Sequence, residues 1–264
     1  LAIDEKRQGP ESYSVARDLL DLSNLYAKLG RPAEALAAAQ RSLSIEEKIQ
    51  PPDSIEITVA LEALSSRYFE AAQYQKAVNA LRRAYAIAEK KFGPGHPETT
   101  EVLLLLSDAQ MELGALAEAR KNCEQAIALE KETFGPAHVR VGESLLRLAN
   151  LDWRAGEKRA ALEHALTSEE ILRRQFIQVA PILSEREALH YETARASGVN
   201  LSISSLLALA GETRRQTISK VWDEIIRSRA LVLGEMAARH AAFTTSAAPG
   251  IARQARDLAA ARNR

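Results

Sequence analysis

This chain has little cysteine, few aromatic side chains and no net charge. Of its 264 residues only Cys123 is a cysteine, so no disulfide can form within the chain, which favours a reducing compartment, and we expect the cytoplasm. Phe, Trp and Tyr make up 5% of the sequence, which suits helices that pack closely through small residues. Lys plus Arg and Asp plus Glu both number 35. A duplex-DNA binder usually carries a basic excess, so we expect no nucleic-acid partner.

Long apolar runs are also missing. No stretch approaches the ~20 apolar residues that a membrane helix needs. The densest stretch, residues 102–106, falls inside a repeat. We therefore expect no membrane partner. No signal peptide is visible, but the chain begins with Leu1 rather than Met, and we expect it to be a piece of a longer protein.

The sequence does contain a period of 42 residues. Four prolines stand one period apart: Pro10, Pro52, Pro94 and Pro136. A leucine column and an alanine column keep the same step: Leu22, Leu64, Leu106 and Leu148, and Ala35, Ala77, Ala119 and Ala161. An internal period of about 20–50 residues is typical of stacked repeat proteins, which bury a core between neighbouring repeats and offer an open surface to a partner.

Each period predicts a hairpin of two helices. Leucines three residues apart, such as Leu19 and Leu22, mark a buried helical face. A glycine, such as Gly30, then stops the first helix, and the Gly-Pro or Pro-Pro pair ends the second because proline cannot continue a helix. Asp53-Ser54 and the residues from His96 to Thr99 are expected to provide N-caps and first turns. The sequence therefore predicts an all-α fold.

The pattern Leu-x2-Leu-Ser-x2-Tyr, followed by the alanine column and the proline, resembles the tetratricopeptide repeat with Leu in the usual Trp place. Residues 92–97 and 134–138 resemble the long repeats of kinesin light chain, which are common in bacterial proteins. The resemblance covers residues 12–178. It implies a right-handed superhelical solenoid of antiparallel helix pairs, followed here by additional C-terminal helices.

The period also predicts the domain organisation. Ile3 falls in the column of Ile45 and Ile87, so residues 1–178 are expected to form the repeat array, with a partial first unit at 1–11 and four full units to 178. Residues 179–264 are expected to form a helical linker or cap, with helices at about 184–210, 213–243 and 251–262 and a loop at 244–250. Ser184 and Glu187 have the spacing of a capping box.

Two stretches of this linker region, 183–189 and 221–233, resemble the helices that precede CHAT domains in bacterial proteins. CHAT domains are caspase-like cysteine peptidase modules that often follow tetratricopeptide arrays. The resemblance implies a parent protein with a protease downstream. Nothing in this chain matches the catalytic part of that family, so we expect the chain itself not to be an enzyme.

No catalytic, metal or cofactor site is expected. Cys123 shares a column with Ala39 and Leu81, which predicts a buried packing position rather than a nucleophile. The five histidines show no metal-ligand spacing, and His96 and His138 are expected to cap or pack at hairpin junctions. The carboxylate pairs at 46–47 and 169–170 are expected on solvated outer faces.

Three large aromatic residues remain. Phe69 and Trp153 share a column next to the turn of the hairpin, where two interpretations stay open: a hot spot for a partner, or packing at the hairpin tip. Trp222 is expected in the core of the C-terminal helical region.

The resemblance places the first helix of each hairpin on a concave groove. Ten side chains are expected to form a partner-binding groove there: Asn24, Lys28, Glu62, Ser66, Glu70, Asp108, Glu112, Arg147, Asn150 and Arg154. The centre of this set is acidic. Asn24 and Asn150 resemble the asparagines with which tetratricopeptide grooves hold peptide backbones, since one amide can bond both N–H and C=O.

The sequence therefore predicts a non-catalytic scaffold that binds a protein or peptide, with basic residues favoured in the partner. Two alternatives stay open. Any single groove residue can instead be part of a solvated face. The array can also serve self-association through its outer faces, and the oligomeric state is not predicted.

Overall fold

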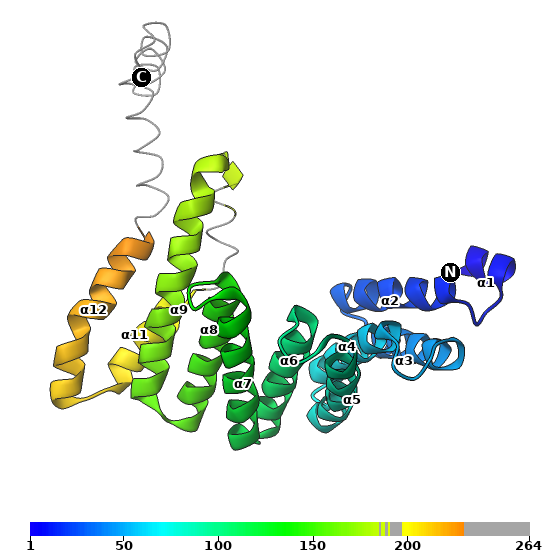
Figure 1. The fold of residues 1–264 in the computed structure, drawn as a ribbon, viewed down its shortest axis with the longest axis horizontal. Coiled ribbons are helices and arrows are strands. Elements are labelled where there is room, and N and C mark those ends of the chain that lie inside the picture. Colours follow the sequence, from blue (N-terminus) through cyan, green and yellow to red (C-terminus); the bar gives the residue numbers. More distant parts are fainter. Residues whose placement is uncertain (185, 188–189, 191–196, 230–264) are drawn as a thin grey trace, which may run out of the picture. The chain divides into compact units, whose positions relative to one another are not determined.

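The computed structural model describes residues 1–184, 186–187, 190 and 197–229, and every regular element in those ranges is helical. The chain divides into two compact units, Leu1–Ala137 and His138–Arg264. The helices of the first unit are α1 (Ala2–Gln8), α2 (Tyr13–Lys28), α3 (Pro32–Ile49), α4 (Ile55–Glu70), α5 (Tyr74–Phe92), α6 (Pro97–Leu113) and α7 (Leu116–Phe134) (Figure 1). Those of the second are α8 (Val139–Ala155), α9 (Lys158–Val179), the short 3₁₀ helix η1 (Ala180–Ile182), α11 (Val199–Ala208) and α12 (Gly211–Arg229).

The predicted all-α fold of stacked helix pairs is confirmed. The hairpins α2/α3, α4/α5, α6/α7 and α8/α9 follow the four periods, and short turns join their helices. The division into two compact units falls between α7 and α8 in the chain, inside the repeat array. The predicted boundary at residue 178 follows the loss of the sequence period and stays a prediction.

The repeat columns occupy the core as expected. The alanine column is fully buried, and so is Cys123. In the small-residue column of the second helices, Ser42 and Ser168 each donate a hydroxyl hydrogen bond to a carbonyl of the preceding helix, at 2.8 Å to Ala16 and 2.6 Å to Gly142. A larger side chain at these positions would separate the two helices of the hairpin.

The predicted caps are also confirmed. His96 and His138 are the N-caps of α6 and α8, where their Nδ1 atoms accept hydrogen bonds from the backbone N–H two residues later, at 3.2 and 3.3 Å. Ser54 caps α4, and Ser184 and Glu187 form the reciprocal capping box, at 2.8 and 3.3 Å.

The linker region differs from the prediction of one helix over 184–210. Residues 197–198 are not helical, and α11 begins only at Val199. A Cβ atom on Gly198 would lie 2.2 Å from the carbonyl oxygen of Ala165, so α11 starts where glycine allows a close approach to α9. The predicted helix over 213–243 is present as α12; its part beyond Arg229, the loop at 244–250 and the helix at 251–262 lie outside the described residues.

Three expectations about burial are wrong. Glu46 and Glu169 are buried rather than solvated, and burial raises the pKa of Glu46. Trp222 is 55% exposed rather than part of a core, because α12 packs through Val221 on another of its faces.

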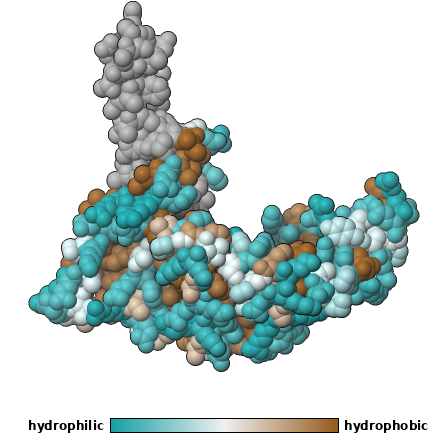
Figure 2. All heavy atoms as spheres, in the orientation of Figure 1, coloured by the Kyte–Doolittle hydropathy of each residue, from teal (hydrophilic) through white to brown (hydrophobic). Residues whose placement is uncertain are grey.

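In the view of Figure 2 hydrophilic side chains cover most of the described surface, and hydrophobic residues show in separate patches. No helix among the described residues is long and apolar enough to cross a membrane.

Candidate protein-binding surface

Helices α4 and α6 carry the acidic part of the predicted groove. Glu62, Ser66 and Glu70 follow one another at four-residue steps along α4, and Asp108 and Glu112 are one such step apart on α6. Side chains four residues apart lie on the same face of a helix. All five residues belong to the first compact unit, together with Asn24 and Lys28 on α2, which are both exposed.

A pocket of about 210 Å³ opens where α4 and α6 flank α5. Its lining combines apolar and polar residues: Ser65, Ser66, Phe69, Glu70, Ala77, Leu81, Leu105 and Asp108. Three predicted groove residues, Ser66, Glu70 and Asp108, therefore meet around one cavity.

Glu62 lies in an acidic environment on the same helix. Its pKa is raised to about 7, first by burial and then by the neighbouring carboxylates of Glu98 and Glu101 on α6. Near pH 7 the side chain is therefore about half protonated. Burial is the larger cause because it disfavours the charged form, and the two carboxylates of α6 add repulsion.

One cation on α4 offsets part of this negative charge. Arg67 forms an ion pair with Glu70, with Nη2 and Oε1 3.0 Å apart, and Arg67 Nη1 donates to the carbonyl oxygen of Ser23 at 3.3 Å. The second contact joins α4 to α2, so Arg67 has a structural role as well as an electrostatic one.

The remaining predicted groove residues, Arg147, Asn150 and Arg154, lie on α8 in the second compact unit. Asn150 and Arg154 are exposed and Arg147 is half-buried. Asn150 Nδ2 donates to the carbonyl oxygen of Leu146 at 2.9 Å within the same helix. In this conformation the Asn150 amide supports its own helix.

The aromatic residues at the hairpin tips pack locally. Phe69 makes an edge-to-face contact with Tyr74, with ring centroids 5.4 Å apart, but it is also 37% exposed and lines the pocket. The Nζ atom of Lys158 lies 3.9 Å from the ring centroid of Trp153. Both residues therefore pack at the tips of their hairpins, and Phe69 in addition lines the candidate site.

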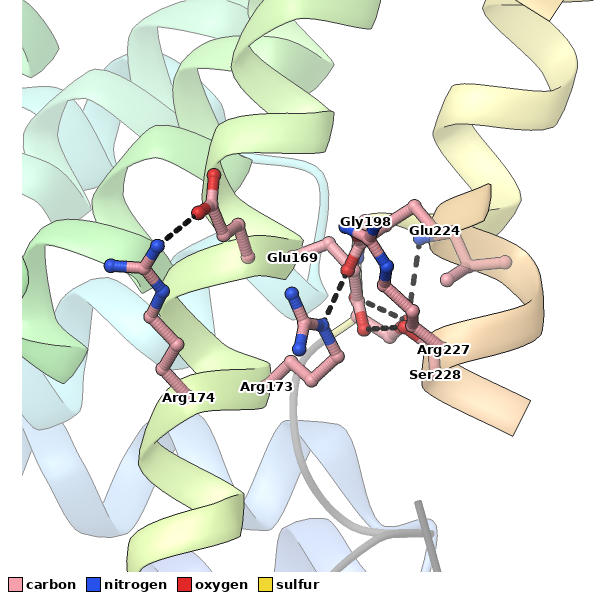
Figure 3. A network of polar contacts seen from close by, with 10 residues as sticks. Glu169, Arg173, Arg174, Gly198, Glu224, Arg227 and Ser228 are labelled. Carbon is pink, nitrogen blue, oxygen red and sulfur yellow. Dashed lines mark hydrogen bonds and ion pairs between the residues drawn. The ribbon is translucent and has the colours of Figure 1, made fainter. Parts of the chain in front are cut away.

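Sequence reasoning missed a buried polar network in the second unit, shown in Figure 3. The carboxylate of Glu169 accepts hydrogen bonds from Ser228 Oγ at 2.6 Å and from Ser197 Oγ and Gly198 N, both at 2.9 Å. Next to it, Arg173 Nε donates to Glu224 Oε1 at 2.7 Å. These bonds connect α9 with the start of α11 and with α12, so the network positions the linker helices.

The sequence did contain a signal for Glu169. One, two and three periods earlier the same column holds Ile127, Tyr85 and Leu43, so an ionisable residue has replaced a hydrophobic one. A similar signal marks Asp152, which occupies the column of Tyr26 and is fully buried. Its Oδ2 lies 2.7 Å from His164 Nδ1.

Cys123 is buried, and in the part of the chain that the structure describes no three His, Cys, Asp or Glu side chains gather as metal ligands. Helices α4 to α6 instead present an open surface that is charged and partly apolar.

The sequence matches the tetratricopeptide repeat family over residues 16–90 and 98–174, more than half of the chain. The chain belongs to the tetratricopeptide repeat family. A search of curated proteins finds no match.

Solved structures show the same fold at low sequence identity. The repeats of a protein described as a kinesin light chain of Podosopora anserina match with 20% identity and a TM-score of 0.60, covering 81% of this chain and 93% of that one. BtubC (BKLC) of P. vanneervenii matches with 16% identity and a TM-score of 0.61, covering 84% and 81%. A Rap protein complexed with Competence and Sporulation Factor matches with 12% identity and a TM-score of 0.54, covering 98% and 72%.

Proposed function

We propose that this tetratricopeptide chain is a non-catalytic scaffold that binds a protein or peptide, and that a partner segment with basic residues lies on the α4–α6 face. The observation that carries the proposal is the meeting of Ser66, Glu70 and Asp108 around one open pocket. A Rap protein of similar fold has been crystallised in complex with Competence and Sporulation Factor, which supports a binding role for such an array. Asn24 and Lys28 on α2 would extend the contact within the first unit, and Arg147, Asn150 and Arg154 on α8 are proposed as contact residues of the second unit by itself.

Electrostatics should dominate the recognition. Along α4 and α6 carboxyl side chains outnumber cations, since the two helices contain only one, Arg67. A basic partner would relieve this repulsion, and the attraction should weaken as salt rises because exposed charges are screened within about 8–10 Å at physiological ionic strength.

The test is to pan a phage-displayed library of random dodecapeptides against the purified chain at low salt. We expect enrichment of basic sequences, whose binding weakens with added NaCl and is lost in the double variant Glu70→Lys/Glu112→Lys. The matched control is Glu118→Lys/Glu132→Lys, which reverses two exposed charges on α7 and should keep binding. Equal binding by the groove variant and the wild type would contradict the proposal.

The proposal also concerns the longer protein to which this chain is expected to belong. The resemblance of 183–189 and 221–233 to helices that precede CHAT domains supports a bacterial protein in which partner binding is relayed to a downstream protease, and the single cysteine favours the cytoplasm. Residues 185, 188–189 and 230–233 of these stretches lie outside the described ones. Sequencing the reading frame beyond Arg264 tests it. A caspase-like domain with a His and a Cys nucleophile is the expected finding, and any other domain would refute it.

Self-association is the second candidate function, favoured by one surface. Ile218, Trp222 and Ile226 are exposed at four-residue steps along α12, so they form an apolar stripe on one face. Sedimentation velocity over a range of concentrations tests it. A mass that rises with concentration in the wild type but not in Trp222→Ser would support self-association, and a concentration-independent monomer would exclude it.

A further inference from the structure

The pocket between α4 and α6 has an apolar floor. Leu81 of α5 is 2% exposed and Ala77 is fully buried beneath the cavity, while Phe69 and Leu105 form apolar walls that remain partly accessible. At about 210 Å³ the cavity is smaller than the roughly 300–1,000 Å³ of typical small-molecule sites. Its size suits one apolar side chain of a larger partner.

Carboxyl groups lie on both sides of this floor along the helix axes. Towards the N-terminal ends, Glu62 lies three to eight positions before the lining residues of α4 and Glu101 four to seven before those of α6, so each is about 8 Å from the middle of its set at 1.5 Å per residue. Towards the C-terminal ends, Glu70 and Asp108 line the pocket itself, and Glu112 follows one turn later.

This arrangement sets a register for an extended chain. Successive side chains of an extended segment point to opposite sides, so residues two positions apart point the same way and are separated by about 7 Å. That distance is close to the spacing between the pocket and the carboxyl groups beyond it. A segment whose middle apolar side chain fills the pocket would therefore place the side chains two positions away near carboxylates.

We propose that the pocket holds one apolar side chain of an extended partner segment that carries Lys or Arg two positions before and two positions after it. The inference rests on the proposed function and gives it a sequence pattern: basic, any, apolar, any, basic. An acidic segment is disfavoured because its carboxylates would meet those of Glu62, Glu70 and Glu101. A purely basic segment would leave the apolar floor in contact with water.

The test uses fluorescein-labelled synthetic nonapeptides in a Ser/Ala background and fluorescence anisotropy with the full chain. The parent peptide carries Lys-Ala-Leu-Ala-Lys at its centre. One comparison peptide replaces Leu by Ser, and another keeps the composition but moves both lysines next to Leu. We expect each change to weaken binding about tenfold or more, since burial of one leucine side chain is lost or the charges fall out of register.

Two protein variants address the pocket directly. Ser66→Phe should fill the cavity and weaken the parent peptide about tenfold, whereas Ser44→Phe makes the same substitution at an exposed position of α3, outside the groove, and should have no effect. Glu101→Gln/Asp108→Asn keeps the shape of the surface and should weaken the peptide while reducing its salt dependence. Circular dichroism melts confirm that each variant folds.

The outcomes separate this inference from the proposed function. One outcome would refute the pocket but keep the charged groove. In it, binding is lost in Glu70→Lys/Glu112→Lys but does not change when the leucine is replaced, when the lysines are moved or in Ser66→Phe. If the parent peptide does not bind up to millimolar concentration, the proposed sequence pattern is also refuted. The panning experiment alone would then show whether the groove binds basic peptides.

Discussion

At the residue scale, one turn departs from the pattern of its repeat. Gly30, Gly114 and Gly156 end the first helix of their hairpins with positive φ angles, whereas the second hairpin has Ala72 there, at φ 54°. An L-residue in this left-handed conformation is destabilised by roughly 1–2 kcal/mol relative to the right-handed one, because its Cβ approaches the following carbonyl oxygen.

We therefore predict that Ala72→Gly increases the free energy of unfolding by about 0.5–1 kcal/mol, the gain being reduced by the greater entropy of glycine in the unfolded chain. Urea denaturation of both proteins measures it. Gly114→Ala is the reciprocal control and should lower stability by about 1 kcal/mol. A destabilised Ala72→Gly variant would show that the turn is not strained.

Glu62 gives a second prediction at this scale. Its pKa is about 7 in the folded chain, against an ordinary value of 4.5. Between these values the unfolded chain releases its proton while the folded chain retains it, so stability falls as pH rises from about 4.5 to 7 and then levels off. The loss attributable to this group is about 2–3 kcal/mol.

Comparison with Glu62→Gln isolates this effect from other titrating groups. The variant should lack this part of the pH dependence, so its advantage over the wild type should grow from pH 5 to pH 8. Urea midpoints at the two pH values provide the measurement. A constant difference between the two proteins would mean that Glu62 titrates normally.

At the scale of elements, α9, α11 and α12 depend on one buried carboxylate. Glu169 is fully buried and accepts hydrogen bonds from Ser197, Gly198 and Ser228, which belong to the other two helices or their approach. Loss of the acceptor would leave buried donors without a partner, and each such donor costs about 1–3 kcal/mol.

Glu169→Leu should therefore destabilise the second unit by about 3 kcal/mol or more. Its neighbour Glu170 is exposed and pairs with Arg174 one turn away at 2.5 Å, so Glu170→Leu should change stability by less than about 1 kcal/mol. Thermal unfolding followed by circular dichroism compares the two. Similar melting temperatures would argue that the network contributes little.

At the scale of the whole molecule, the fold of the array could be predicted from the sequence because the sequence repeats. Every repeat places the same type of residue in the same local environment, so the alanine column, the turn glycines and the caps at Ser54 and His96 each had several independent copies in the sequence. The linker region has no such copies. The start of α11 after Gly198 coincides with a close approach of Gly198 to α9, which no local pattern indicates.

The candidate site was predictable in part for the same reason. The four-residue steps along α4 and α6 are a property of the sequence, and they indicate both the face and its acidic character. The pocket was not predictable, because it forms between side chains of three helices, including Leu81 and Leu105. The groove set as a whole remains a prediction, since its residues on α8 belong to the other compact unit.

The sequence by itself determined the helical hairpins, their number in the array, their turns and caps, and the acidic face, because these follow from spacing within one chain segment. Only the tertiary structure decided that Glu169 is buried, that Trp222 is exposed and that an apolar cavity lies beside Glu70 and Asp108. Burial depends on what a neighbouring helix places opposite a residue, and that is a property of packing rather than of the period.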